Sequence, residues 1–391
     1  MIWNTLEIVV FSVLVFCFIV QMLFYWIVLA KPYYYMHNIA SGRLHSPTAK
    51  PPVSVIVYLK SSKQDLEQFL SNILEQDYPE FEVIIVTDSI LDVDEEILKR
   101  LKNQYENLYS THVPGNTKNV SRKKLALTLG IKAAKYDKLL FTESDSRLRT
   151  TDWIFSMVRH FSDAKTVVLG FSALESTENL SHRFMEYDYF FSNLQMISCA
   201  LLNKPYTGNG RNLAYSEEHF IEQRGFVKHR ILQHGEDDLF INDIATGDNT
   251  AVELSISSVT IAKISDFQDW KRQKTDRMLT QYFYKRGPVA FWRLESYTRI
   301  GFYAALIACL ILGFPYLSQQ YLLLPEIALT CFVIRFSSQL FIINNILKHL
   351  HLEKFYSTIL LFDVLQPFVN LYFYIYRFLK GKKNYTNCYE K

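Results

Sequence analysis

The stretch Lys138-Leu-Leu-Phe-Thr-Glu-Ser-Asp-Ser-Arg147 decides the fold prediction. Its apolar run, Leu139 to Phe141, is typical of a short buried strand, and two carboxylates follow, Glu143 and Asp145. At the C-terminal edge of a parallel sheet, such carboxylates lie in the crevice where α/β proteins bind ligands. A hard divalent cation that holds a diphosphate needs one or two of them. From this stretch alone, a strand that merely ends in a solvated acidic turn stays an open alternative.

The residues before this stretch alternate between strand and helix patterns. Expected strands cover 51–59, 81–88 and 108–113, and expected helices cover 63–76, 92–105 and 121–134. This alternation predicts a mostly parallel, doubly wound α/β sheet. The chain has no GxGxxG after the first strand and no GxxxxGK(S/T), so neither a dinucleotide fold nor a P-loop is supported.

Hydrophobic residues are concentrated at both ends of the 391-residue chain, which indicates membrane segments. Residues 6–30 are apolar over a length that spans hydrocarbon at about 1.5 Å per residue, and they lack the basic start of a signal peptide. Three more candidate spans cover 300–317, 322–345 and 355–378. Lys31, Arg43 and Lys50 follow the first span with no acidic residue among them, so the positive-inside rule predicts a cytoplasmic central domain.

Polar residues interrupt the C-terminal spans. Arg335 lies in the second of the three, and Asp363, Gln366 and Pro367 lie in the third. Polar groups at membrane depth are costly unless they face other helices or a polar cavity. Two interpretations stay open: hydrogen bonds between helices, or the lining of a path for an acceptor.

The topology of the C-terminal end is ambiguous. Three complete crossings place the tail outside, whereas its basic residues favour the inside; these are Arg377, Lys380, Lys382 and Lys383. The sequence leaves open which segment, if any, is re-entrant or interfacial. Residues 281–293 mix aromatic with basic side chains, a pattern typical of a helix in the headgroup region.

Charge and cysteine content exclude other classes. The net charge of +3 is too small to argue for a nucleic-acid partner. The five cysteines have no metal-like spacing and predict neither a zinc site nor a disulfide framework: Cys17, Cys199, Cys309, Cys331 and Cys388.

Two charged positions before the acidic pair are candidate ligands. Asp88 ends an expected strand, where it would accept a hydrogen bond from a base or ribose, or else cap the next turn. Ser121-Arg-Lys-Lys124 opens an expected helix, whose N–H groups and cations favour an anion. A merely solvated basic turn is the alternative for the second position.

Three stretches after the acidic pair also carry candidate chemistry. Gly208 to Tyr215 is a glycine-rich turn in which Arg211 and Asn212 are suited to phosphate or sugar hydroxyls. Gly235-Glu-Asp-Asp-Leu-Phe240 puts three acids at an expected helix start, as a catalytic base with a raised pKa or as dipole partners. Residues 268–277 combine Trp, Gln and several cations, suited to a diphosphate or to a membrane surface.

In this order the stretches resemble the motifs of membrane-bound family-2 glycosyltransferases, in the bacterial branch related to cellulose and hyaluronan synthases and ceramide glucosyltransferases. The series is Val53-Ser-Val-Ile-Val, Asp88, Lys123-Lys-Leu-Ala-Leu…Gly130, Thr142-Glu-Ser-Asp145, Gly208…Tyr215, Gly235-Glu-Asp-Asp238 and Trp270…Gln273-Lys274…Arg277. The resemblance covers about residues 50–280, and the flanking membrane segments also fit it.

The resemblance implies a GT-A fold, a Rossmann-like α/β domain flanked by transmembrane helices. It implies a metal-dependent, inverting hexosyltransferase that takes a sugar from a nucleotide diphosphate sugar, with UDP as the expected carrier. The implied acceptor is a membrane-associated lipid, glycolipid or polysaccharide. The implied location is the bacterial inner membrane, with membrane lipids around the spans and the catalytic domain in the cytoplasm.

The resemblance also assigns roles by motif position. Asp88 corresponds to the contact with the base, and Asp145, helped by Glu143, corresponds to the Asp-x-Asp site for Mg²⁺ or Mn²⁺. Asp237 corresponds to the general base that deprotonates the acceptor hydroxyl. The remaining candidates are Lys123 and Lys124 for the donor, and Arg211, Asn212, Glu236, Asp238, Trp270, Gln273 and Arg277 for the acceptor and diphosphate.

Four departures from the family pattern affect these roles. Glu143 replaces the first Asp of Asp-x-Asp, and Tyr58 replaces the Pro after the first strand, where Lys60-Ser-Ser62 forms the polar run. Three residues instead of two separate Gln273 from Arg277, and Met278 stands where the motif has Trp. The last two departures favour a single addition over processive polymer synthesis.

The expected domains are an N-terminal span (1–32), a glycosyltransferase domain (50–265), juxtamembrane helices (266–298), C-terminal spans (299–380) and a tail (381–391). Two other functions stay open. A non-catalytic relative that binds nucleotide sugars as an envelope-assembly scaffold is suggested by the altered motifs, and a transporter by the membrane segments alone.

Overall fold

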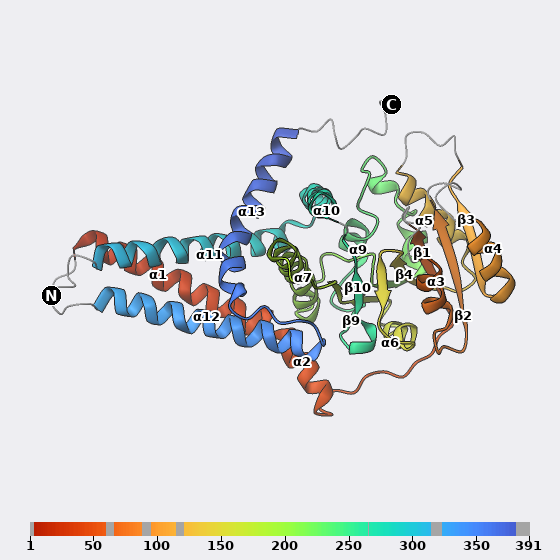
Figure 1. Cartoon of the computed structure of the whole chain (residues 1–391), viewed down its shortest axis with the longest axis horizontal. Coiled ribbons are helices and arrows are strands. Elements are labelled where there is room, and N and C mark those ends of the chain that lie inside the picture. Colours follow the sequence, from red (N-terminus) through yellow and green to blue (C-terminus); the bar gives the residue numbers. More distant parts are fainter. Residues whose placement is uncertain are drawn as a thin grey trace. The chain divides into compact units, whose positions relative to one another are not determined.

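The computed structural model describes residues 4–59, 66–87, 95–114, 121–264, 266–313 and 323–380. The chain forms two compact units (Figure 1). The helical unit comprises Met1–Tyr35 and Lys285–Tyr372, and the α/β unit comprises Met36–Tyr284 and Phe373–Lys391.

The α/β unit is built on a seven-stranded sheet of order β3-β2-β1-β4-β8-β6-β9. The strands are β1 (Val53–Leu59), β2 (Phe81–Thr87), β3 (Leu108–His112), β4 (Lys138–Glu143), β6 (Val167–Gly170), β8 (Leu213–Ser216) and β9 (Thr250–Glu253). The first four are parallel neighbours, with Val53 opposite both Phe81 and Lys138. Strand β8 is antiparallel to β4 and β6, and β6 is parallel to β9. The carboxyl ends of β1, β2 and β4 therefore share one edge of the sheet.

A second sheet has three short strands in the order β5-β10-β7. They are β5 (Ser146–Leu148), β10 (Thr260–Ala262) and β7 (Ser172–Leu174). Strand β10 is antiparallel to β5 and parallel to β7. Because β5 begins three residues after β4 ends, this sheet fixes the direction in which the chain leaves the acidic pair.

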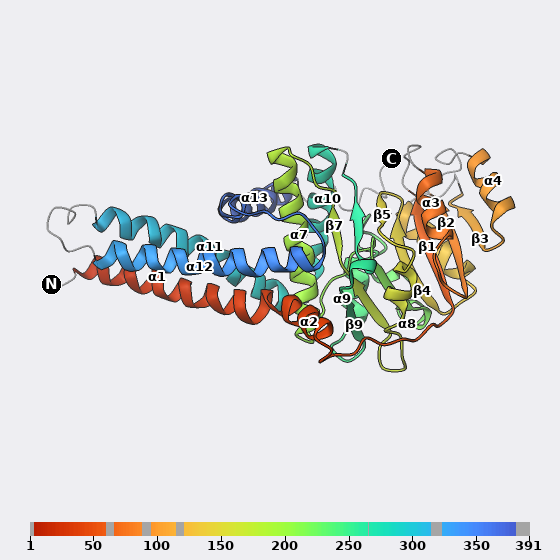
Figure 2. The same ribbon diagram turned by 60° about the horizontal axis from the view of Figure 1, so that its bottom comes forward.

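Helices cover both faces of the large sheet (Figures 1 and 2). The helices of the α/β unit include α3 (Leu66–Leu74), α4 (Glu95–Gln104), α5 (Arg122–Ala133), α6 (Trp153–Val158), α7 (Leu180–Leu201), α8 (Glu217–Glu222), α9 (Asp238–Ile244) and α10 (Phe267–Thr280). Alternate β1 residues, Val53 to Leu59, pack with α3 and α6 in one apolar core. On the other face α5 lies so close that a Cβ on Gly130 would stand 2.5 Å from Val86 Cγ1.

The predicted strand–helix alternation is confirmed throughout the described part of residues 51–143. Six expected elements match β1, α3, β2, α4, β3 and α5, and Ser121 caps α5 by accepting a hydrogen bond from the Lys124 N–H. The main addition is the antiparallel β8, so the sheet is mixed. Strand β2 ends at Thr87, and Asp88 lies outside the described residues.

The helical unit confirms the four predicted apolar segments. The element series is α1 (Thr5–Leu23), a π-helical turn η1 (Phe24–Leu29), α2 (Lys31–Ala40), α11 (Arg286–Gly313), α12 (Leu323–His349) and α13 (Thr358–Lys380). Among the described residues, four helical stretches are long and apolar enough to cross a membrane: Thr5–Ala40, Arg286–Gly313, Leu324–His349 and Thr358–Tyr376. The orientation of these helices in a membrane stays a prediction.

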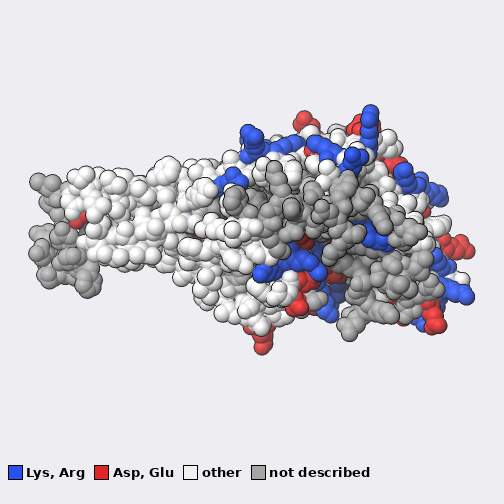
Figure 3. All heavy atoms as spheres, turned by 90° about the horizontal axis from the view of Figure 1, so that it is seen from above, with Lys and Arg blue, Asp and Glu red and all other residues white. Residues whose placement is uncertain are grey.

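The stretch 281–293 does not form a separate helix. Gln281–Phe283 is a single 3₁₀ turn, η5, and the residues from Arg286 onward are the first turns of α11. Figure 3 shows Lys, Arg, Asp and Glu gathered over the α/β unit, whereas the visible surface of the long helices is nearly free of them.

Candidate active site

The acidic pair stands where β4 ends. Glu143 is the last residue of β4 and is buried, and Asp145 lies in the turn that leads to β5. Two backbone hydrogen bonds fix this turn: Ser144 N–H donates to the Tyr58 carbonyl at 3.0 Å, and Lys263 N–H donates to the Asp145 carbonyl at 2.7 Å. The turn is therefore held by both sheets.

Arg211, in the turn before β8, forms a two-bond ion pair with Asp145. Its Nε and Nη2 donate to Asp145 Oδ1 and Oδ2 at 2.9 and 2.8 Å. Nη2 also donates to Gln273 Oε1 at 3.0 Å and lies 3.6 Å from Glu143 Oε2. Burial disfavours the charge on Arg211, but Asp145, Tyr189 and Glu143 together outweigh burial and raise the pKa of the guanidinium well above its usual value.

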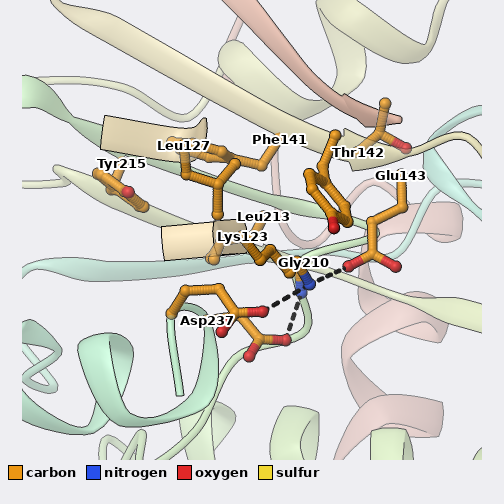
Figure 4. A pocket seen from close by; sticks show the side chains of 11 residues that line it. Lys123, Leu127, Phe141, Thr142, Glu143, Gly210, Leu213, Tyr215 and Asp237 are labelled. Carbon is orange, nitrogen blue, oxygen red and sulfur yellow. Dashed lines mark hydrogen bonds and ion pairs between the residues drawn. The ribbon is translucent and has the colours of Figure 1, made fainter. Parts of the chain in front are cut away.

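Lys123, on the first turn of α5, bridges two acids (Figure 4). Its Nζ lies 2.6 Å from Glu143 Oε1 and 2.5 Å from Glu236 Oε1, and 5.0 Å from the centre of the Tyr58 ring. Burial would raise the pKa of Glu236, yet Lys123 holds that pKa below its usual value. The other oxygen, Glu236 Oε2, is buried without a hydrogen-bond partner.

Asp237 is held at the start of α9 by the backbone. Its Oδ2 accepts a hydrogen bond from the Gly210 N–H at 2.9 Å, and its Oδ1 accepts one from the Asp238 N–H at 2.8 Å. Arg277 Nη2 on α10 lies 3.9 Å from Oδ2. The turn before it needs Gly235, whose φ of +106° is a left-handed conformation that other residues rarely adopt.

Asp238 points away from Asp237 into a buried network. It accepts hydrogen bonds from the Thr280 hydroxyl and from the Tyr284 hydroxyl, the latter at 2.7 Å. Burial, reinforced by the charge of Asp237, raises the pKa of Asp238 to about 6. Asp238 therefore ties the end of α10 to α9 and supports the site from behind.

Helix α10 presents one face to the site. Trp270, Gln273, Lys274 and Arg277 share this face because they are three or four residues apart. Trp270 is buried against aromatic rings of Phe184, Phe267 and Phe373. Lys274 Nζ lies 2.5 Å from Asp188 Oδ1 on α7. Trp270 and Lys274 thus anchor the helix, which leaves Gln273 and Arg277 to meet Arg211 and Asp237.

Two of the candidate site residues hydrogen-bond to the surrounding fold in this structure. Lys124 Nζ donates to the carbonyls of His229 and Leu232 at 2.7 and 2.9 Å, which fixes the loop before α9. The Asn212 amide accepts from Trp153 Nε1 and donates to the carbonyls of Phe171 and Ser258. The role of Asp88 stays a prediction, because it lies outside the described residues.

A small cavity of about 20 Å³ adjoins the cluster of charged residues formed by Glu143, Asp145, Glu236, Asp237, Lys123, Arg211 and Arg277 (Figure 4). Its lining combines the charged ends of the site with apolar side chains of the sheet: Tyr58, Lys123, Leu127, Phe141, Thr142, Glu143, Gly210, Leu213, Tyr215, Glu236 and Asp237. Four of the predicted site residues thus line one space: Lys123, Glu143, Glu236 and Asp237.

The carboxylates suit a divalent cation only in part. Their oxygens are the hard ligands that Mg²⁺ and Mn²⁺ prefer. Within the described residues, however, no group of three or more His, Cys, Asp and Glu side chains is arranged to hold a metal ion. Glu143 and Asp145 therefore fit a cation whose remaining ligands come from a bound diphosphate and water.

Sequence reasoning missed several residues that shape the site. Asn209 Nδ2 donates to the Tyr189 hydroxyl and to Asn193 Oδ1, and the Arg211 guanidinium lies 5.9 Å from the Tyr189 ring centre. The Gly210 N–H that holds Asp237 was also missed. Gly208 and Gly210 indicated that the backbone approaches another group closely there. Nothing in the sequence indicated that this group is Asp237, which lies 27 residues from Gly210.

Comparisons with known proteins give the class. The mannosyltransferase PcManGT from Pyrobaculum calidifontis, solved with GDP-Man and Mn²⁺, superposes with a TM-score of 0.51 at 19% identity, covering 88% of this chain and 99% of that one. TarS 1-349 of S. aureus, solved with UDP-GlcNAc, gives a TM-score of 0.39 at 15% identity, covering 76% and 81%. No curated protein matches the chain in sequence. The α/β unit has the GT-A fold of glycosyltransferases, as predicted.

Part of the sequence also matches a family model. Residues 11–197, just under half of the chain, match the model of glycosyl transferase family 21. The match begins inside the first apolar helix and extends through β4 and the acidic pair into α7.

Proposed function

We propose that this glycosyltransferase moves a hexose from a nucleotide diphosphate sugar to a hydroxyl of a membrane-associated acceptor, with inversion. The observation that carries the proposal is the position of Asp237. Its carboxylate is fixed by the N–H groups of Gly210 and Asp238 and faces Arg277. A base held this way suits deprotonation of an incoming hydroxyl.

The proposed reaction requires few catalytic groups, and the charged cluster contains a candidate for each. A single displacement needs one base and stabilisation of the leaving diphosphate, without a covalent nucleophile. Lys123, Arg211 and Arg277 are cations close to the acids, suited to phosphate oxygens. Mg²⁺ or Mn²⁺ at Glu143 and Asp145 would supply further neutralisation of the leaving group when bound.

We infer that the acceptor is a lipid, a glycolipid or a polysaccharide at a membrane. In the part of the chain that the structure describes, four helical stretches are long and apolar enough to cross a membrane. The basic residues after the first span favour an α/β unit in the cytoplasm. The family resemblance supports a bacterial inner membrane as the location. UDP is the proposed carrier, and GDP is the alternative to test because the mannosyltransferase that superposes on this fold was solved with GDP-Man.

The test uses the full chain in detergent and a panel of UDP- and GDP-sugars with Mn²⁺. Binding and the slow release of nucleoside diphosphate would be measured for wild type, for Asp237→Asn and for Asp248→Asn, an exposed aspartate between α9 and β9 that serves as control. We expect Asp237→Asn to keep binding but to lose release by at least about a hundredfold, as for loss of a general base. The control should match wild type.

Other outcomes would separate the alternatives. Binding without release from any of the three proteins, even with lipid acceptors added, would favour the scaffold. Failure to bind any nucleotide sugar would contradict the donor site and revive the transporter.

A further inference from the structure

Arg211 occupies both oxygens of Asp145, the carboxylate assigned to the cation. The pair uses two hydrogen bonds of 2.9 and 2.8 Å, the geometry that makes guanidinium–carboxylate pairs strong. A cation that approached Asp145 on its own would have to displace this guanidinium. The displacement would leave Arg211 buried with fewer partners, which is costly.

The residues around Asp145 have only a small surplus of negative charge with which to attract a bare cation. Four carboxylates, Glu143, Asp145, Glu236 and Asp237, lie beside three cations, Lys123, Arg211 and Arg277. A free divalent ion would gain little from a site this close to neutral. A diphosphate changes the balance because its oxygens attract both the ion and the guanidinium.

We propose that Arg211 is an exchangeable counter-ion, paired with Asp145 in the free enzyme and with the donor diphosphate once a divalent cation takes Asp145. This inference rests on the proposed function of the site. It makes cation binding and diphosphate binding mutually dependent: neither ligand binds well alone, and each improves the affinity of the other by the same factor.

The surroundings of Arg211 permit this exchange. Asp145 keeps 16% of its side chain exposed, so ligands can reach it, while Arg211 is 8% exposed. Gln273 Oε1 and the Tyr189 ring contact the guanidinium from α10 and α7. These two contacts do not depend on Asp145, so they can keep the guanidinium in the site when its partner changes.

The test measures binding, not turnover, on the full chain in detergent. Mn²⁺ affinity would be determined by electron paramagnetic resonance, alone and with saturating UDP or GDP, and nucleotide affinity by calorimetry with and without Mn²⁺. For wild type we expect the nucleotide to tighten Mn²⁺ binding by about tenfold or more. For Arg211→Gln we expect Mn²⁺ alone to bind about tenfold tighter and the nucleotide about tenfold weaker, so that the coupling shrinks.

Two further variants control for folding and charge. Arg183→Gln breaks a comparable pair with Glu186 on α7 and should leave both affinities unchanged. Arg211→Lys keeps the charge but cannot make the two-bond pair, so its Mn²⁺ affinity should fall between wild type and Arg211→Gln. If Arg211→Gln does not fold, judged by its melting temperature, the Lys variant carries the test.

Three results would overturn the exchange. An Arg211 variant with wild-type affinities for both ligands would do so and leave the proposed function standing. If wild type binds UDP with the same affinity in the presence and absence of Mn²⁺, and GDP likewise, the two ligands are not coupled. Failure of wild type to bind any nucleoside diphosphate would overturn both the exchange and the proposed function.

Discussion

The α/β unit and the helical unit each contain a cluster of charged side chains, and the two clusters differ in how completely their members are enclosed. In the helical unit, Arg335 and Asp363 are both fully buried, and their side chains pair at 2.8 Å. In the α/β unit, the corresponding pair of Arg211 and Asp145 keeps 8% and 16% of its side chains exposed. The Arg335–Asp363 pair is therefore sealed from solvent, whereas solvent and ligands can reach the open pair of Arg211 and Asp145.

The helical cluster joins several segments of its unit. Asp363 on α13 accepts hydrogen bonds from Tyr303 on α11 and Gln339 on α12 at 2.6 and 2.9 Å. Arg335 on α12 donates to Gln21 on α1 and to Tyr25 in the π-helical turn. Each segment thus contributes at least one polar group to the same buried network.

Charge balance separates the clusters as well. Arg299 and Arg335 face Glu295 and Asp363, two cations against two carboxylates, with pairs at 2.6, 3.3 and 2.8 Å. The α/β cluster has one carboxylate in excess among the four acids and three cations described above. The fully buried helical cluster has equal numbers of positive and negative groups, which favours hydrogen bonding between helices as the role of its polar residues. The partly exposed α/β cluster has a net charge, which suits the binding of ligands.

The largest effect should come from unbalancing the sealed cluster. Asp363→Leu leaves two arginines without their shared carboxylate, which costs about 3–5 kcal/mol for a buried pair. We expect little folded protein, measured as monodisperse yield in detergent. Arg335→Met combined with Asp363→Leu should recover much of the yield, because Arg299 still pairs with Glu295. Glu326→Gln, an exposed acid at the start of α12, is the control. Normal yield for the single variant would contradict a structural role.

Removal of divalent cations should affect only the open cluster. In excess chelator we expect nucleoside diphosphate release to fall by at least about a hundredfold, because a cation that stabilises the leaving group contributes several kcal/mol. The melting temperature should stay unchanged, and added Mn²⁺ should restore the activity. Full activity in excess chelator would remove the metal role from Glu143 and Asp145.

A smaller effect is expected from Lys123→Met, which leaves Glu143 and Glu236 facing each other. Because Lys123 is partly exposed, we expect a loss of about 1–3 kcal/mol in the free energy of unfolding at neutral pH. The pKa of Glu236 is lowered in wild type, so the loss should shrink as the pH falls through the carboxylate range. Denaturant unfolding of wild type, the Met variant and Lys123→Met with Glu236→Gln would measure it. A double variant no more stable than the single one would contradict the pairing.

The sequence predicted the first half of the fold because its elements have strong local patterns. β1 and β2 are rich in β-branched residues, and α3 carries its apolar residues at helical spacing. The second sheet was not predicted, because β5, β7 and β10 have three residues each and their pairing depends on distant partners. The antiparallel place of β8 likewise depends on tertiary context.

Site residues were predicted as neighbours in sequence, although neighbours rarely face the same way. Lys123 and Lys124 are successive helical residues about 100° apart, so one meets the acids and the other meets a loop. Arg211 and Asn212 divide in the same manner between Asp145 and the core. The ion pairing of the acids with Lys123 and Arg211 had no local signal, since the partners lie 20 and 66 residues apart.

The smallest effect that we expect is a pH-dependent change in stability when Asp238, the buried neighbour of Asp237, is replaced. Asp238 is buried, and its pKa is raised to about 6, above the 3.8 of an exposed aspartate. A raised carboxyl pKa means that the stability contributed by the protonated form is complete below about pH 4 and is lost as the pH rises through about 6. Asp238→Asn stays neutral, so its melting temperature relative to wild type should increase between pH 4 and 7, by the equivalent of about 1–2 kcal/mol.

Asp248→Asn, the exposed control, should show no such trend. A constant difference between Asp238→Asn and wild type across this range would contradict the raised pKa. It would imply that the Thr280 and Tyr284 hydroxyls stabilise the ionised carboxylate at least as much as burial disfavours it. Asp238 would then be ionised across the whole range, and Asp237 would lie next to a second negative charge even at about pH 4.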